Sequence, residues 1–175
     1  PALPEVYDFL SSLYKELIEK YDIDGIQFDY LRYPNSHDYT NDFGYDAYTR
    51  QLFINFTGTD PISLMPDDSL WQKWCEFREY IISSYACRIF SELKSIHPEI
   101  QISVDVWPDY DEILSDIYQN PKTWVRKDYI NTLIPMSYYL HEKPVIDDLV
   151  NTLAFSRGHS QITSGIATFN KVDTK

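Results

Sequence analysis

The sequence is short of positive charge and of long apolar runs, and each shortage excludes a class of partner. Lys and Arg number 15 against 27 Asp and Glu, so the formal net charge is -12 at pH 7. Such a chain repels phosphate backbones and anionic lipid, which argues against nucleic acid and membrane surfaces as partners. No run of 18 apolar residues occurs, so we expect no membrane span.

Cysteine and glycine are also scarce, with two and five residues among 175. Cys75 and Cys87 fall in one expected helix, separated by roughly 18 Å at 1.5 Å per residue, so they cannot form a disulfide with each other. Zinc-ligand spacings are absent, and no two histidines stand at ligand spacing, so we expect no metal. Gly25 and Gly165 are isolated and match neither glycine-rich phosphate motif, so we expect no nucleotide or other cofactor.

Aromatic residues are in excess, with 15 Tyr, 9 Phe and 4 Trp, and such rings suit both sugar faces and protein cores. The most informative stretch is 23–34, which predicts a strand over 23–30. Ile26 and Phe28 point to one side of this strand, and Gln27 and Asp29 point to the other. A polar face that ends in a carboxylate just before a long loop is typical of a catalytic group in a parallel α/β fold. The alternative is an edge strand with a solvated polar face.

The hydrophobic pattern predicts alternating helices and strands along the whole chain. We expect the N-cap of the longest helix at Ser69 or Asp68 and the C-cap of the last helix at Gly158. Residues 35–68 form a long polar and aromatic segment, which contains a short helix ended by Gly58. The expected helices are 4–21, 45–56, 70–97, a short one within 109–127, and 144–157; the expected strands are 23–30, 102–107, 129–139 and 162–168.

This alternation indicates a parallel sheet, and one polar sheet face favours a barrel over an open sheet. The predicted fold class is therefore α/β, a parallel (β/α) barrel of TIM type. About four strand–helix units are only half of a barrel that usually needs about 250 residues. We expect residues 1–175 to be part of a single such domain, with a long inserted loop at about 35–68. The missing strands are expected before Pro1 and after Lys175, and self-association of a half barrel is the alternative.

Several motifs resemble those of a known family. Residues 24–34, Asp-Gly-Ile-Gln-Phe-Asp-Tyr-Leu-Arg-Tyr-Pro, resemble the fourth-strand signature of the glycosyl-hydrolase-like TIM-barrel proteins called family 10 glycosylhydrolase-like. Weaker matches are 71–78, 103–108 and 128–139. The resemblance covers nearly the whole chain and implies strands four to seven of a TIM barrel. It also implies a bacterial glycoside hydrolase that acts on a polysaccharide, with an exported location favoured over the cytoplasm.

The first strand is also similar to strands of glycoside hydrolase families 13 and 18. Gln27 replaces the middle acid of the family 18 pattern, and Leu31 and Arg32 stand where its proton-donating Glu would be. In the family 13 pattern the fourth-strand Asp is the nucleophile, a role that this resemblance would carry to Asp29. The fifth-strand acid of family 13 is a Glu, and this sequence has Asp105 instead.

Glycoside cleavage needs two carboxyl groups that flank the scissile bond. Asp29 and Asp105 are the only acids at inward-facing positions near the C-terminal ends of expected strands, so we predict that they form the catalytic pair. The alternatives are structural: Asp29 paired with Arg32, and Asp105 hydrogen-bonded to Tyr138 or Ser103.

Seven side chains are expected to bind a carbohydrate substrate, although core packing is the alternative for each ring. Two further functions stay open, a non-catalytic carbohydrate-binding or degenerate barrel and a metal-dependent deacetylase. The fragment alone is expected to be inactive, because half a barrel has two unpaired sheet edges. The predicted substrate-binding residues are Arg32, Tyr30, Tyr33, Trp107, Tyr138, Tyr139 and His37.

Overall fold

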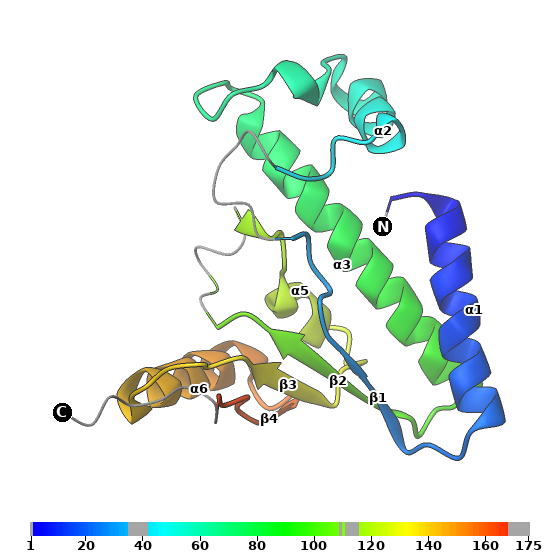
Figure 1. Ribbon diagram of the computed structural model, residues 1–175, viewed down its shortest axis with the longest axis vertical. Coiled ribbons are helices and arrows are strands. Elements are labelled where there is room, and N and C mark those ends of the chain that lie inside the picture. Colours follow the sequence, from blue (N-terminus) through cyan, green and yellow to red (C-terminus); the bar gives the residue numbers. More distant parts are fainter. Residues whose placement is uncertain (1, 35–41, 109, 111–115, 168–175) are drawn as a thin grey trace.

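The computed structural model describes residues 2–34, 42–108, 110 and 116–167, and it has the predicted α/β fold with a parallel sheet. Four parallel strands lie in the order β1-β2-β3-β4 and alternate with helices along the chain (Figure 1). This arrangement is compatible with an incomplete barrel of TIM type. The elements are α1 (Pro4–Lys20), β1 (Gly25–Phe28), α2 (Ala47–Thr57), the 3-10 helix η2 (Pro61–Ser63), α3 (Trp71–Ile96), β2 (Gln101–Val106), α5 (Pro121–Val125), β3 (Thr132–Pro135), α6 (Glu142–Ser156) and β4 (Gln161–Ile162).

Three of the strands are shorter than the sequence predicted. β1 ends before Tyr30, whose φ of 58° is left-handed and incompatible with an extended strand. β3 ends at Pro135, which has no N–H to donate to the ladder. β4 has only two regular residues, but hydrogen bonds from Thr163 and Gly165 continue its pairing with β3.

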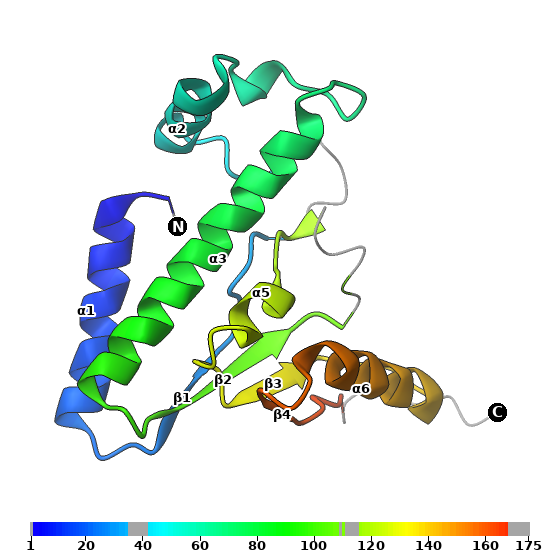
Figure 2. The same cartoon turned by 180° about the vertical axis from the view of Figure 1, so that it is seen from behind.

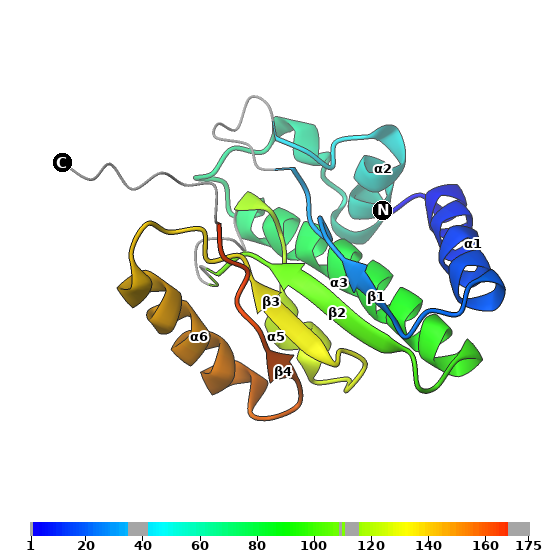
Figure 3. The same cartoon turned by 60° about the horizontal axis from the view of Figure 1, so that its bottom comes forward.

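The two faces of the sheet differ in polarity. Phe28, Val104 and Leu133 are in register on one face, and all three are buried in the core. Gln27 and Ser103 are in register on the opposite face. Helices α3 and α5 lie behind the sheet in Figure 3, and Figure 2 shows the same arrangement from another side. Among the described residues, no helix covers the polar face, which is the arrangement expected of a barrel interior.

The long helix α3 is the main support of the core. Its Phe90 is fully buried and packs edge-to-face on Phe28 of β1, with ring centroids 5.2 Å apart. Helix α1 lies beside α3 (Figure 1, Figure 2). Three side chains of α1 bind the carboxylate of Glu92 on α3, namely Tyr7, Ser11 and Lys15, at 2.8, 2.5 and 2.5 Å.

The predicted cap residues of two helices were wrong. Helix α3 has Leu70 at its N-cap without a side-chain hydrogen bond. Asp68 does not cap it, because its carboxylate accepts a hydrogen bond from the backbone N–H of Met65 at 2.7 Å. The C-cap of α6 is Arg157, with φ 47°, and Gly158 follows with φ 82°. The expected end of α2 at Gly58 is confirmed, since its left-handed φ of 76° forms the C-cap.

The N-terminal ends of the strands are held together by the side chain of Asn131. Its Oδ1 accepts hydrogen bonds from the backbone N–H of Ile102 and from Nζ of Lys94, at 2.9 and 3.0 Å. Lys94 also donates to the carbonyl of Ile100 at 2.6 Å. The backbone of Asn131 pairs with Ile102 on one side and with Gln161 on the other. This end of the sheet is therefore aligned without any contribution from the opposite loops.

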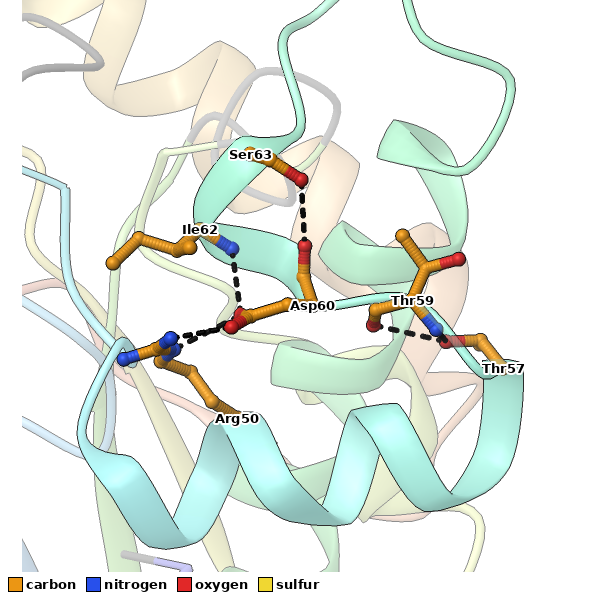
Figure 4. A network of polar contacts seen from close by, with 6 residues as sticks. All are labelled: Arg50, Thr57, Thr59, Asp60, Ile62 and Ser63. Atoms are coloured by element: carbon orange, nitrogen blue, oxygen red, sulfur yellow. Dashed lines mark hydrogen bonds and ion pairs between the residues drawn. The ribbon is translucent and has the colours of Figure 1, made fainter.

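The described part of the inserted segment, residues 42–68, folds over the N-terminal end of α3 (Figure 1). Its local structure depends on Asp60, which binds the guanidinium of Arg50 through both carboxylate oxygens (Figure 4). Asp60 also accepts a hydrogen bond from the backbone N–H of Ile62 at 3.1 Å, and its carbonyl accepts one from Ser63 at 3.0 Å.

A buried ion pair between Asp42 and Arg78 joins this segment to the core. Arg78 is fully buried, and its guanidinium carbon lies 4.0 Å from the ring centroid of Tyr118 and 4.8 Å from that of Trp74. Stacking on aromatic rings partly replaces the solvation that the guanidinium loses on burial.

Both cysteines are free, as expected, with Cys75 buried and Cys87 half-buried. Across the parts of the chain that the structure describes, the helices are too short or too polar to cross a membrane.

Candidate functional site

Asp29 lies directly after the end of β1, and Asp105 lies in the neighbouring strand β2. Gln27 of β1 is level with Ser103 of β2, and Phe28 is level with Val104. Asp105 continues β2 on the face opposite the core, and Asp29 follows Phe28 directly after the end of β1. Asp105 is buried, whereas Asp29 is exposed at the point where β1 has ended.

Asp105 is held by an amide that the sequence analysis did not identify as its partner. Nε2 of Gln27 donates to both carboxylate oxygens of Asp105, at 3.0 and 2.8 Å. Tyr138, one of the two partners considered from the sequence, feels the charge of this carboxylate, which raises the pKa of its hydroxyl. Burial raises the pKa of Asp105, the hydrogen bond from Gln27 opposes this rise, and the negative charge of Asp29 adds to it. Asp105 therefore retains a proton to a higher pH than an ordinary aspartate.

Asp29 lies at a sharp turn of the backbone. The N–H of Tyr30 donates to its carboxylate at 2.7 Å, and Tyr30 itself has a left-handed φ of 58°. This turn leaves the ring of Tyr30 69% exposed. Left-handed backbone costs about 1–2 kcal/mol for a residue other than glycine, so the turn is strained.

The structural alternative for Asp29, an ion pair with Arg32, is not found between these two described residues at 4 Å or less. The guanidinium carbon of Arg32 instead lies 4.4 Å from the ring centroid of Tyr30 and 5.9 Å from that of Trp107. Arg32 also donates to the carbonyl of Tyr33 at 3.3 Å. Arg32 thus connects the aromatic residues that follow β1 and β2.

Tyr138 and Trp107 lie at the same end of the sheet as the two aspartates. The ring of Tyr138 is 48% exposed and that of Trp107 is 38% exposed. Burial raises the pKa of Tyr138, and the charges of Asp105 and then Asp29 raise it further. The pKa of the Tyr138 hydroxyl is therefore linked to the charge of both carboxylates.

The remaining predicted substrate-binding residues are Tyr33, Tyr139 and His37. Tyr33 is buried and packs edge-to-face on Tyr118, with ring centroids 5.6 Å apart, so it is not available to stack on a sugar. Tyr139 lines a separate hollow of about 590 Å³, together with Asp148 and other residues of α6. His37 lies outside the described residues.

Two residues at this end of the sheet were not predicted from the sequence. The sequence could have indicated Gln27, because strand parity predicts it on the same face as Asp29. No feature of the sequence indicated Gln119, because it lies in an irregular segment without hydrophobic periodicity. Gln119 is fully buried, and its Oε1 accepts a hydrogen bond from the N–H of Trp107 at 2.8 Å. Within the described ranges, no three His, Cys, Asp or Glu side chains gather in a way that could hold a metal ion.

Comparison with known proteins gives a family and a set of distant relatives. A family model described as glycosyl hydrolase-like 10 matches residues 1–167. Glycosyl hydrolase DigH of Escherichia coli O6:H1 is 22% identical over 160 residues, which cover 79% of this chain. The same identity and coverage hold for DigH of Escherichia coli K12 and of Shigella flexneri. The chain spans 31% of the length of these curated relatives. The chain therefore belongs to the glycosyl hydrolase-like 10 family, which its motifs predicted.

Proposed function

We propose that this chain supplies the two catalytic carboxylates, Asp29 and Asp105, of a glycoside hydrolase that cleaves O-glycosidic bonds in a polysaccharide. The observation that carries the proposal is the difference between the two acids. Asp105 is buried and has a raised pKa, while Asp29 is exposed just after the end of the neighbouring strand β1. Two neighbouring carboxyl groups in different environments are what an acid and a nucleophile or base require.

The raised pKa of Asp105 supports the proton-donating role for this residue in the proposal. Protonated Asp105 gives its proton to the glycosidic oxygen while the bond from that oxygen to the anomeric carbon breaks. In a retaining reaction Asp29 attacks the anomeric carbon, and water then hydrolyses the glycosyl–enzyme bond with Asp105 as the base. In an inverting reaction Asp29 activates the water directly. Carboxyl separations of about 5–5.5 Å favour retention, and separations of about 6.5–9.5 Å favour inversion.

The aromatic side chains around the two acids support a carbohydrate as the substrate. Tyr30, Trp107 and Tyr138 are all partly exposed, and aromatic faces pack well on the C–H faces of sugar rings. In this proposal Arg32 keeps Tyr30 and Trp107 in place. Residues 1–175 would form part of one glycoside-hydrolase-like barrel domain, with residues 35–68 as an inserted segment.

Substitution in the full-length natural protein tests the proposal. Asp29→Asn and Asp105→Asn should each reduce the release of reducing ends from a panel of plant polysaccharides and bacterial cell-wall glycan by at least about 100-fold. Asp22→Asn is a matched control, because Asp22 is an exposed acid at the opposite end of β1. Undiminished cleavage by Asp29→Asn would refute the proposal. Sugar binding that survives both substitutions, without any product from the wild-type protein, would identify a non-catalytic carbohydrate-binding barrel.

A further inference from the structure

We infer that Gln119 is a positioning residue, which holds the backbone that carries Asp29 against the backbone that carries Asp105. The inference rests on the proposed function of these two carboxylates. It concerns a side chain that is buried beneath the site and has no direct route to a substrate.

The amide of Gln119 connects the ends of two neighbouring strands. Its Oε1 accepts a hydrogen bond from the N–H of Trp107 at 2.8 Å, and its Nε2 lies 3.3 Å from the carbonyl oxygen of Asp105. The same Nε2 lies 3.4 Å from the carbonyl oxygen of Leu31, which follows Asp29 by two residues. One side chain therefore contacts the backbone of both segments that carry the predicted acids.

The segment around Gln119 is itself anchored to the loop that follows β1. The N–H of Tyr33 donates to the carbonyl of Ile117 at 3.0 Å. The rings of Tyr33 and Tyr118 pack edge-to-face, and the ring of Tyr118 contacts the buried guanidinium of Arg78. Tyr118 has a left-handed φ of 55°, which turns the chain just before Gln119. The position of the amide is thus set by several contacts on its N-terminal side.

The chemistry of this position requires an amide. Trp107 presents a donor, whereas Leu31 and Asp105 present carbonyl acceptors, so the side chain between them must both accept and donate. A methionine of similar size does neither and leaves these backbone groups unpaired. A glutamate accepts from Trp107 in either protonation state, but it donates only when it is protonated.

The functional consequence concerns the pKa of Asp105. That pKa is raised by burial and by the charge of Asp29. Both causes depend on how closely the loop after β1 lies against the end of β2. Without the amide of Gln119, this loop is released from β2, water reaches Asp105 and the influence of Asp29 declines. A residue that served only for folding would not control this titration in the protein that remains folded.

The experiment compares Gln119→Met with wild type in the full-length natural protein. The titration of Asp105 is followed by carboxyl ¹³C NMR, with its resonance assigned from its absence in Asp105→Asn. Gln119→Met should shift the pKa of Asp105 down, toward the ordinary range of aspartate. If the protein cleaves a polysaccharide, its kcat should fall at least about tenfold with little change in KM. Gln119→Glu should regain activity relative to wild type as the pH is lowered, because protonation restores a donor.

The controls separate this inference from the proposed function. Gln72→Met is the matched variant, since Gln72 is an exposed glutamine at the start of α3 that donates to Glu76. Suppose that Gln119→Met lowers the pKa of Asp105 but the wild-type protein cleaves no glycan. This result would support the positioning role of Gln119 and refute the proposed hydrolase. An unchanged titration and an unchanged kcat in Gln119→Met would overturn the positioning role and leave the hydrolase intact. Failure of both Gln119 variants to fold, while Gln72→Met folds, would assign Gln119 to folding and also overturn the inference.

Discussion

Both carboxylate oxygens of Asp105 accept a hydrogen bond from the same nitrogen of Gln27, at 3.0 and 2.8 Å. The two residues are 78 positions apart in the sequence and meet because β1 and β2 are parallel neighbours. This amide favours the charged form of the carboxylate, whereas burial disfavours it. The pKa of Asp105 therefore depends on two opposing effects, and a single substitution can change it.

Gln27→Leu should raise the pKa of Asp105 further, because it removes the contact that opposes the rise. If Asp105 is the proton donor, the alkaline limb of kcat/KM should move to higher pH. Carboxyl ¹³C NMR of Asp105 and a pH–rate profile measure the two effects. Gln51→Leu is the control, since Gln51 is exposed on α2 and donates to Asn55 at 2.9 Å. A lower pKa in Gln27→Leu would contradict this account.

Tyr30→Gly should distinguish the backbone strain at Tyr30 from the contribution of the Tyr30 ring to substrate binding. Glycine adopts the left-handed φ of 58° without steric cost, so the free energy of unfolding should stay within about 1 kcal/mol of wild type. The loss of an exposed ring beside Asp29 should still raise KM for a polysaccharide. Tyr30→Ala has the same loss of ring and should be about 1 kcal/mol less stable than Tyr30→Gly. Equal stability of the two variants in urea denaturation would show that the turn is unstrained.

Asp42→Ala should destabilise the protein by about 3–5 kcal/mol, because it leaves the buried charge of Arg78 without its partner. The double variant Asp42→Ala, Arg78→Met should recover much of this loss, since no uncompensated charge remains. Denaturant unfolding of the two single variants and the double variant measures the coupling. Arg50→Met is the comparison, because the Arg50–Asp60 pair is much more exposed and its removal should lose far less stability than Asp42→Ala. Additive effects at Asp42 and Arg78 would contradict the proposed coupling.

Glu92→Gln should change how the free energy of unfolding depends on pH in the acidic range. Hydrogen bonding by Lys15, and then by Ser11, lowers the pKa of Glu92 from about 4.5 to about 2. The folded state therefore binds fewer protons than the unfolded state between these values. The stabilisation is complete above about pH 4.5 and is lost as the pH falls toward about 2.

In Glu92→Gln this part of the pH dependence should be absent, and the loss at pH 7 should be about 2 kcal/mol. Urea unfolding at a series of pH values measures both quantities. Glu16→Gln is the control, because Glu16 forms only an exposed helical pair with Lys20. An acid limb that is as steep in Glu92→Gln as in wild type would assign the dependence to other carboxylates.

Much of the fold could be predicted from short-range pattern. The alternation around Phe28 and Asp29 assigned the faces of β1 correctly, and the parallel sheet follows from alternating strands and helices. The ends of the strands were less predictable. β1 ends just before Tyr30, which adopts a left-handed backbone conformation. The local propensity of tyrosine does not predict this conformation. The N-cap of α3 was missed for a similar reason, because Asp68 uses its carboxylate in an earlier turn.

The site was only partly predictable, because its contacts join residues far apart in the chain. Strand parity predicts a shared face for Asp29 and Asp105, but the contact of Gln27 with Asp105 requires the register of two strands. Tyr33 shows the opposite case. Its place beside Tyr30 suggested a sugar-binding ring, yet the backbone pairing of Tyr33 with Ile117 turns it into the core.

The alignment of the strands at Asn131 has a consequence for how this scaffold can diversify. Lys94 and Asn131 fix the starting ends of the strands, while every residue proposed for chemistry lies at the finishing ends. These contacts do not involve the loops after β1 and β2, so substitutions there that keep Gln119 leave the hydrogen bonds of Lys94 and Asn131 in place. Variants of these loops can therefore be compared on an unchanged start of β2 and β3.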